Sequence, residues 1–121
     1  MIGYVTFGTN DLPRAVAFYE RLLAPLGVKR TWDSERGVAW GSDGQPSLGV
    51  MKPFDGQPAT RGNGTTVALA VDSRDKVDEI HKLALELGAT DEGPAGPRGE
   101  GFYAGYFRDP DGNKLNVFCF G

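Results

Sequence analysis

The chain has few of the residues that make covalent or metal cross-links: its 121 residues include one cysteine and one histidine. A single cysteine excludes an internal disulfide bond, and with a single histidine it excludes a zinc site of the usual types. No apolar run approaches the roughly 20 residues that cross a bilayer, and the first residues carry no basic leader, so we expect a cytoplasmic protein without a membrane partner. The formal net charge of -3 argues against nucleic acid as a partner, because it gives no general attraction to phosphate backbones.

Glycine and proline are plentiful instead. The 18 glycines and 8 prolines follow no collagen-like period, and they therefore predict many tight turns between short strands. At the usual length of ~100 to 200 residues per domain, we expect a single domain over residues 1–121.

The first part of the chain predicts a strand followed by a helix. Ile2–Gly8 alternates apolar and polar residues as a strand does. Asp11 is a suitable N-cap and Pro13 a suitable first-turn residue for a helix that runs to about Leu26. Gly27 suits the left-handed position that ends a helix.

The same pattern returns in the second half. Thr66–Val71 predicts a strand, Ser73 an N-cap, and Gly88 the end of a second helix. Val5 corresponds to Val67, and the residues that follow match at nearly the same offset. This internal repeat predicts two related halves.

Three short strands are expected after each helix, separated by turn residues. They are Val28–Asp33, Gly37–Ser42, Ser47–Lys52, Ala89–Glu92, Phe102–Arg108 and Lys114–Phe120. Two segments rich in glycine and proline, Pro53–Gly64 and Gly93–Gly101, predict loops, and the second is a candidate lid.

The predicted fold class is therefore α+β. Two βαβββ repeats, about 1–55 and about 64–121 with a linker over about 53–64, form a curved mixed sheet with one helix packed outside each half. Strand alternation directs Tyr4 and Thr6 of the first strand, and Asn116 and Phe118 of the last, to the concave face. Pairing with the last strand directs Tyr106 there as well.

Aromatic rings with polar tips suit an organic ligand, although core packing or a subunit interface explains any single ring equally well. Polar side chains that converge inward, those of Tyr4, Thr66, Tyr106 and Asn116, are harder to dismiss, because buried polar groups need partners. A bound ligand, water or one another could satisfy them. The predicted ligand-binding residues are Tyr4, Trp40, Thr66, Tyr103, Tyr106, Asn116 and Phe118. Arg98 and Glu100, on the glycine-rich loop, are either solvated charges or groups that close over a ligand.

Two segments together resemble a known family. IGYVTFGTNDLPRAVAFY at residues 2–19 and FRDPDGNKLN at residues 107–116 are similar to the vicinal oxygen chelate superfamily. This superfamily includes glyoxalase I, extradiol dioxygenases, fosfomycin-resistance transferases and bleomycin-resistance proteins. The resemblance covers nearly the whole chain and implies the paired βαβββ fold. By its spacing before the closing turn, Tyr106 matches a tyrosine that contacts substrate in the fosfomycin-resistance relatives.

The resemblance also implies where a metal would be bound. The ligand positions of the enzymes correspond here to Tyr4, Thr66 and Asn116, and the mirror of Asn116 in the first half is about Gly49. Neutral oxygens of these types are weak donors for a catalytic transition metal, which imidazole and carboxylate groups normally hold. We therefore expect no metal and no cofactor.

The remaining reactive side chains predict structural roles. His81 lies at the edge of the apolar stripe of the second helix, which favours a half-exposed surface position over acid or base chemistry. Cys119 should lie under the sheet as a buried thiol. Asp109 and Asp111 fit side-chain hydrogen bonds within the closing turn better than they fit a catalytic pair.

The first functional hypothesis is a protein similar to the bleomycin-resistance branch, which binds a small organic molecule without transforming it. The alternative is a metal-dependent glyoxalase- or dioxygenase-type enzyme, a lyase, isomerase or oxygenase. A third possibility is metal-free acid and base chemistry by Tyr4 or Tyr106, whose ordinary pKa near 10 makes them poor bases. The resemblance implies a homodimer, with halves either exchanged between subunits or closed within one chain.

Overall fold

Each half of the chain folds as a strand, a helix and three further strands in a computed structural model that describes residues 1–121. The two halves form separate units, Met1–Thr60 and Arg61–Gly121. The α+β class and the two predicted βαβββ modules are therefore confirmed, and each module has its own mixed four-stranded sheet. Neither α1 nor α2 has the length and apolar character of a membrane-spanning helix.

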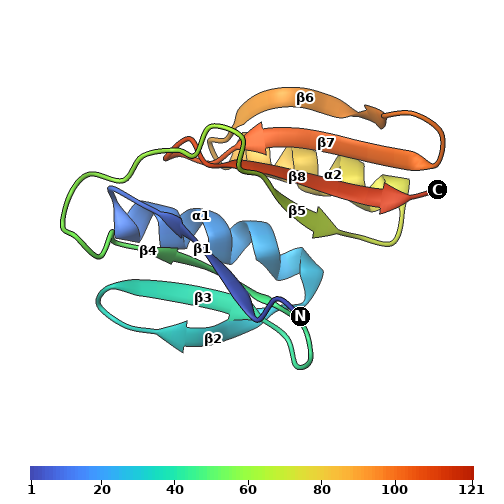
Figure 1. Ribbon diagram of the computed structural model, residues 1–121. Coiled ribbons are helices and arrows are strands. Elements are labelled where there is room, and N and C mark those ends of the chain that lie inside the picture. The colour runs from blue at the N-terminus through green and yellow to red at the C-terminus, as the bar shows by residue number, and fades with distance from the viewer. The chain divides into compact units, whose positions relative to one another are not determined.

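The first unit holds a sheet with the strand order β1-β4-β3-β2 (Figure 1). Its first strand runs parallel to the fourth, and the other pairs are antiparallel. The elements are β1 (Tyr4–Gly8), α1 (Leu12–Leu23), η1 (Ala24–Leu26), β2 (Lys29–Asp33), β3 (Gly37–Gly41) and β4 (Ser47–Met51).

Local signals of the sequence begin and end α1 as expected. The Asp11 side chain accepts a hydrogen bond from the Arg14 amide at 3.1 Å, which satisfies one of the free N–H groups of the first turn. After η1, Gly27 takes a left-handed conformation with φ of 75°. One face of α1 is buried with the helix side of the sheet, and the buried apolar residues of this core are Phe7, Ala15, Phe18, Tyr19, Leu22, Leu23, Val38, Trp40, Leu48 and Val50.

The second unit repeats this plan with the strand order β5-β8-β7-β6. Its elements are β5 (Val67–Ala70), α2 (Arg74–Glu86), β6 (Thr90–Pro97), β7 (Phe102–Arg108) and β8 (Lys114–Phe120). Ser73 caps α2 by accepting a hydrogen bond from the Lys76 amide at 3.1 Å. The buried apolar residues of this core are Val77, Ile80, Ala84, Ala104, Phe107, Leu115, Val117 and Cys119. The prediction of a buried Cys119 is thus confirmed.

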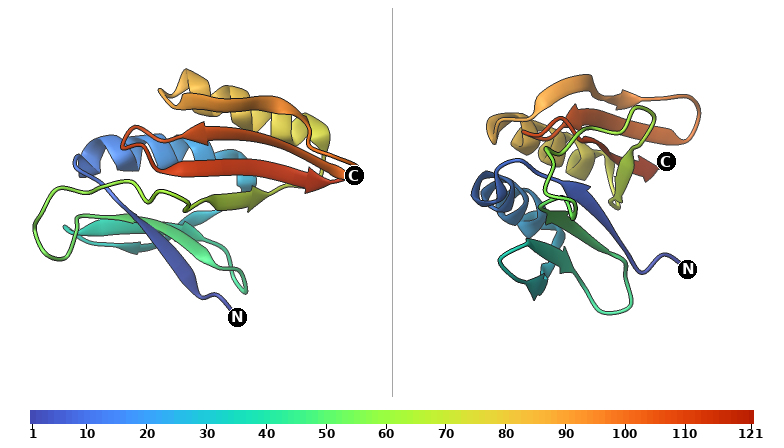
Figure 2. Two further views of the ribbon diagram at one scale, coloured as in Figure 1. Left: turned by 45° about the horizontal axis from the view of Figure 1, so that its top comes forward. Right: turned by 60° about the vertical axis from the view of Figure 1, so that its left-hand side comes forward.

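Strand β6 corrects the predicted loop over Gly93–Gly101. The strand continues to Pro97, and only residues 98–101 form the turn that leads into β7. Two shifts in the β6–β7 register, between Asp91 and Gly93 and between Gly93 and Gly96, let the glycines and prolines fit. Figure 2 shows β6 running beside β7, and as an edge strand it tolerates prolines that a central strand would not.

The turn between β7 and β8 is organised by Asp109, which is buried. Its carboxylate accepts hydrogen bonds from the backbone amides of Asp111 and Asn113, both at 2.9 Å, and from the Asn113 side-chain amide at 3.0 Å. The prediction that the Asp109 carboxylate serves the turn is confirmed.

His81 is buried, contrary to the predicted half-exposed surface position. Its Nε2 atom lies 3.1 Å from the backbone oxygen of Tyr106 and 3.3 Å from the Asp91 carboxylate. The ring fits because Gly105, the residue of β7 beneath it, has no side chain. A Cβ atom at Gly105 would lie 2.8 Å from Cδ2 of His81.

The substitution Gly105→Ala is expected to lower the free energy of unfolding by about 1–3 kcal/mol, because the added methyl group forces His81 out of its packed position. Urea unfolding measures this change. Gly3→Ala is the matched control, since its Cβ would meet no atom within 4 Å, and it should change stability by less than about 0.5 kcal/mol. Equal effects of the two substitutions would contradict the packing role of Gly105.

Candidate functional site

The sheet of the first unit has a hollow on the face opposite α1. The hollow encloses about 440 Å³. Small residues, Ala39 and Gly49, lie on the central strands, and larger side chains surround them. The residues that line this first-sheet hollow are Gly3, Tyr4, Thr6, Thr31, Trp32, Ala39, Ser47, Gly49 and Met51.

An irregularity in β2 supplies two of the lining residues. The β2–β3 register shifts between Arg30 and Trp32, so Thr31 has no partner of its own in the ladder. Both Thr31 and Trp32 line the hollow, and the Thr31 hydroxyl lies 3.2 Å from that of Ser47. The Trp32 side chain stays 47 % exposed, so its ring is available to a ligand.

The prediction that Trp40 belongs to the concave face is wrong. Its indole is buried on the helix side, where Nε1 donates a hydrogen bond to Glu20 of α1 at 2.5 Å and the ring centroid lies 5.9 Å from that of Tyr19. In the β3–β4 register Trp40 is opposite Leu48, a core residue, which fixes its side of the sheet.

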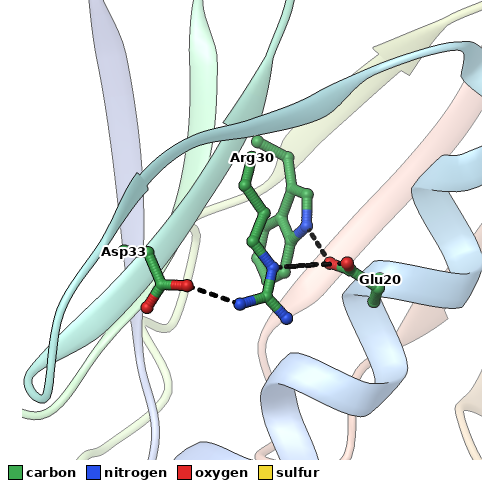
Figure 3. Close-up of polar contacts among 4 residues, drawn as sticks. Glu20, Arg30 and Asp33 are labelled. Atoms are coloured by element: carbon green, nitrogen blue, oxygen red, sulfur yellow. Dashed lines mark hydrogen bonds and ion pairs between the residues drawn. The ribbon is translucent and has the colours of Figure 1, made fainter.

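Glu20 also belongs to a cluster with two charged residues of β2, Arg30 and Asp33 (Figure 3). Arg30 donates a hydrogen bond to Glu20 through Nε at 3.1 Å and to Asp33 through a terminal nitrogen at 2.6 Å. The hydrogen bond from Trp40 lowers the pKa of Glu20 most, and the hydrogen bond and charge of Arg30 lower it further. This cluster connects α1 to β2 and β3 on the side away from the hollow.

The second sheet places three predicted residues on its concave face, which is the face away from α2. Tyr106 of β7 is paired with Asn116 of β8, and Phe118 lies one alternation further along β8. The rings of Phe118 and Phe102 stack with centroids 5.5 Å apart. Asn116 is 7 % exposed, and its Oδ1 atom is buried with no hydrogen-bond partner.

Two cations flank Tyr106 on this face. The Arg98 guanidinium lies 5.6 Å from the ring centroid and the Lys114 ammonium 5.4 Å from it. Arg98 is held by the backbone oxygens of Pro94 and Gly96, at 2.5 and 3.1 Å. Neither cation forms an ion pair with a carboxylate. Sequence reasoning considered Arg98 and missed Lys114, because the contact depends on the β7–β8 register.

Tyr103 lies on the helix side of the second sheet, so its assignment to the concave face is also wrong. It is paired with Cys119, a core residue. Its hydroxyl donates a hydrogen bond to Asp78 of α2 at 2.6 Å, and the Arg74 guanidinium lies 4.9 Å from its ring centroid. The hydrogen bond to Asp78 raises the pKa of Tyr103, because the phenolate would lose it.

Tyr4 and Thr66 complete the predicted set. Tyr4 lines the first-sheet hollow and is 72 % exposed. Thr66 is exposed and directly precedes β5, in which Ala68 is paired with Asn116. Thr31, Ser47 and Met51 also line the hollow and were not predicted. Alternation along β4 was a usable signal for Ser47 and Met51, whereas no sequence signal marks the bulge at Thr31.

The fold and the concave faces define the class: paired βαβββ modules, each with one helix on one face of its sheet. A family model, Glyoxalase/Bleomycin resistance protein/Dioxygenase superfamily, matches residues 1–117. The chain belongs to this superfamily.

Solved structures agree with this assignment. A glyoxalase/bleomycin resistance protein from Albidiferax ferrireducens T118 is 35% identical with a TM-score of 0.92, over 100% of this chain and 99% of that chain. A putative glyoxalase from Bacillus halodurans is 24% identical, with a TM-score of 0.81 over 98% of this chain and 95% of that chain, a likeness in fold. A comparison with curated protein sequences yields no match.

The donor groups do not fit the divalent metal that the superfamily resemblance implies. The corresponding positions hold Tyr4, Thr66 and Asn116, all neutral oxygen donors. The one histidine, His81, lies on the helix side of β7. No group of three or more histidine, cysteine, aspartate or glutamate side chains is placed to hold one metal ion. Neutral hydroxyl and amide oxygens do not supply the charge and basicity that fix a catalytic transition metal.

The pH dependence of stability tests the Glu20 cluster. Because its pKa is lowered in the folded state, ionised Glu20 stabilises the fold above the ordinary glutamate pKa of about 4.3, and this contribution disappears as the pH falls through the lowered value. The urea midpoint of the wild type should therefore be higher than that of Glu20→Gln at about pH 7, and this difference should shrink as the pH falls below the ordinary glutamate pKa of about 4.3.

Glu86→Gln is the control for this measurement, since Glu86 is exposed on α2 and forms no ion pair. Its difference from wild type should vary less with pH than that of Glu20→Gln. A difference in urea midpoint between wild type and Glu20→Gln that stays constant or grows on acidification would contradict the role of the ionised carboxylate.

Proposed function

We propose that the protein binds a small organic molecule on the concave faces of its sheets and does so without a catalytic metal. The observation that carries this proposal is the first-sheet hollow, whose volume of about 440 Å³ is of the size that small-molecule pockets have. Tyr4 and Trp32 offer exposed aromatic surface there, and Thr6, Thr31 and Ser47 offer hydroxyl groups.

Close packing at the floor of the hollow leaves little room for a larger side chain at Gly49. A Cβ atom at Gly49 would lie 3.2 Å from both the Ala39 side chain and the backbone oxygen of Val38. The protein therefore has little room for a larger side chain at the floor, while the space above the floor is open to a ligand. Aromatic walls with a few polar groups favour an organic ligand over water alone.

The second sheet supports the same proposal through its polar side chains. The buried Oδ1 atom of Asn116 lacks a hydrogen-bond donor, and such a group costs free energy until it finds one. A ligand with an N–H or O–H group supplies the donor once the amide turns to meet it. Tyr106, Phe118 and Asn116 then act as binding residues on this sheet.

The residue types present support binding without chemical transformation. No carboxylate, thiol or imidazole lines the first-sheet hollow, so acid and base catalysis there would depend on Tyr4, and a tyrosine is ordinarily a poor base at neutral pH. The family name joins enzymes with resistance proteins. We infer that this chain is closer in activity to the resistance proteins, which hold a compound rather than convert it.

Metal analysis tests the metal-free part of the proposal. Purified protein after dialysis should retain no stoichiometric divalent metal, and added Zn²⁺, Ni²⁺ or Mn²⁺ should not raise the Tm, because ions that bind only the native state stabilise it by mass action. A stoichiometric metal that survives dialysis would overturn this part and favour the lyase, isomerase or oxygenase alternative.

A thermal-shift screen of small organic compounds tests binding in the hollow. For a compound that raises the Tm, Trp32→Ala should weaken binding by about tenfold, because a large aromatic contact is lost. Phe54→Ala is the matched control, since Phe54 is 96% exposed and does not line the hollow. Chromatography of the recovered compound should show it unchanged. Equal losses for the two variants would contradict the hollow as the site, and a converted compound would contradict binding without reaction.

A further inference from the structure

We infer that the concave face of the second sheet accepts an elongated anionic amphiphile, a molecule with a carboxylate or similar anionic head and an aromatic tail. This inference rests on the proposed function and specifies the chemical class of ligand for the second sheet. It depends on how charge and aromatic surface are arranged along β7 and β8.

One end of this face is cationic. Arg98 and Lys114 flank the ring of Tyr106 within 6 Å of its centroid, and neither is neutralised by a carboxylate. The neighbouring Arg108 differs, since its guanidinium is paired with Glu92 and also donates to the backbone oxygen of Gly112 at 2.8 Å. Two uncompensated cations in a chain with a net charge of -3 create a local site for an anion.

The other end of the same face is aromatic. Phe102 of β7 is paired with Phe120 of β8, and Phe118 contacts both rings, with centroids 5.5 and 5.4 Å away. Phe120 is 80% exposed, so the cluster is not a closed core. Exposed rings grouped in this way offer apolar surface to a ligand.

Strand geometry sets the distance between the two ends. Lys114 and Phe118 lie four residues apart on β8, which is roughly 13 Å at the usual rise per residue. Between them on β8 lies Asn116, and its partner on β5, Ala68, is too small to block a ligand chain. The unpartnered Oδ1 of Asn116 therefore lies between the cationic and aromatic ends, where a polar group of the ligand satisfies it.

The cations and the rings together indicate the ligand. A purely apolar molecule leaves Arg98 and Lys114 uncompensated, and an organic cation is repelled by them. An anionic head that reaches Lys114 forms charge-assisted hydrogen bonds, which are stronger than neutral ones. An aromatic tail then covers Phe118 and Phe102.

Three probes that share one tail test this inference: 6-phenylhexanoate, 6-phenylhexan-1-ol and 6-phenylhexylamine. Calorimetric titration at neutral pH and low salt should show the carboxylate binding about tenfold more tightly than the alcohol, with the amine weakest. Lys114→Gln should weaken carboxylate binding by about tenfold and leave the alcohol unchanged. Lys114→Arg should keep the preference for the carboxylate.

Lys82→Gln is the matched control, because Lys82 is an exposed lysine on α2, outside the concave face. It removes the same charge and should leave all three titrations as in wild type. Thermal unfolding of each variant shows that it is folded before titration.

Other outcomes separate this inference from the proposed function. An alcohol or amine that binds as tightly as the carboxylate overturns the anionic class while small-molecule binding stands. A carboxylate preference that Lys114→Gln does not reduce, or that Lys82→Gln reduces equally, overturns the assignment to this face. If none of the probes binds while the compound screen finds a ligand, the amphiphile is wrong and the proposed function stands; if the screen also finds none, both fail.

Discussion

Each four-stranded sheet is covered by a single helix of its own unit, and this one-sided cover decides what the two faces of each sheet contain. Apolar side chains on one face, such as Val50 in the first unit and Val117 in the second, are fully buried with the helix. Burial of such side chains provides most of the stabilisation of a small domain. Because side chains alternate along a strand, the same register that builds the core directs every second residue to the opposite face.

The concave faces of the two sheets carry different side chains. On the first sheet, Gly49 and Ala39 leave a hollow, and the β2 bulge adds Thr31 and Trp32 to its wall. On the second sheet, a larger side chain, Asn116, takes the place that corresponds to Gly49, and charged and aromatic groups are separated along the strands. The internal repeat thus preserves the backbone plan while the two faces have different chemistry.

The superfamily assignment and the donor groups lead to different expectations about chemistry. The resemblance implies a divalent metal, whereas the residues at the corresponding positions, Tyr4, Thr66 and Asn116, are poor ligands for such a metal. A fold by itself does not define an activity, so the side chains decide between metal-dependent chemistry and metal-free binding. The homodimer that the resemblance implies stays a prediction.

Most of the fold could be predicted because its signals are local. The N-caps Asp11 and Ser73, the alternation in β8 and the closing Asp109 turn all depend on neighbours within a few residues. β6 was misjudged because glycine and proline favour loops in general, whereas an edge strand with register shifts accommodates them.

The sequence by itself determined the two βαβββ repeats, the core side of β1, β5 and β8, and the lack of imidazole and carboxylate groups at the positions where a metal would be held. Only the tertiary structure decided where Trp40 and Tyr103 lie. Each ring has a polar tip that can find a partner on either side of a sheet, and the partners, Glu20 and Asp78, lie 20 and 25 residues away on the helices. The cationic pair around Tyr106 likewise depends on the pairing of strands, which brings together residues that local patterns do not connect.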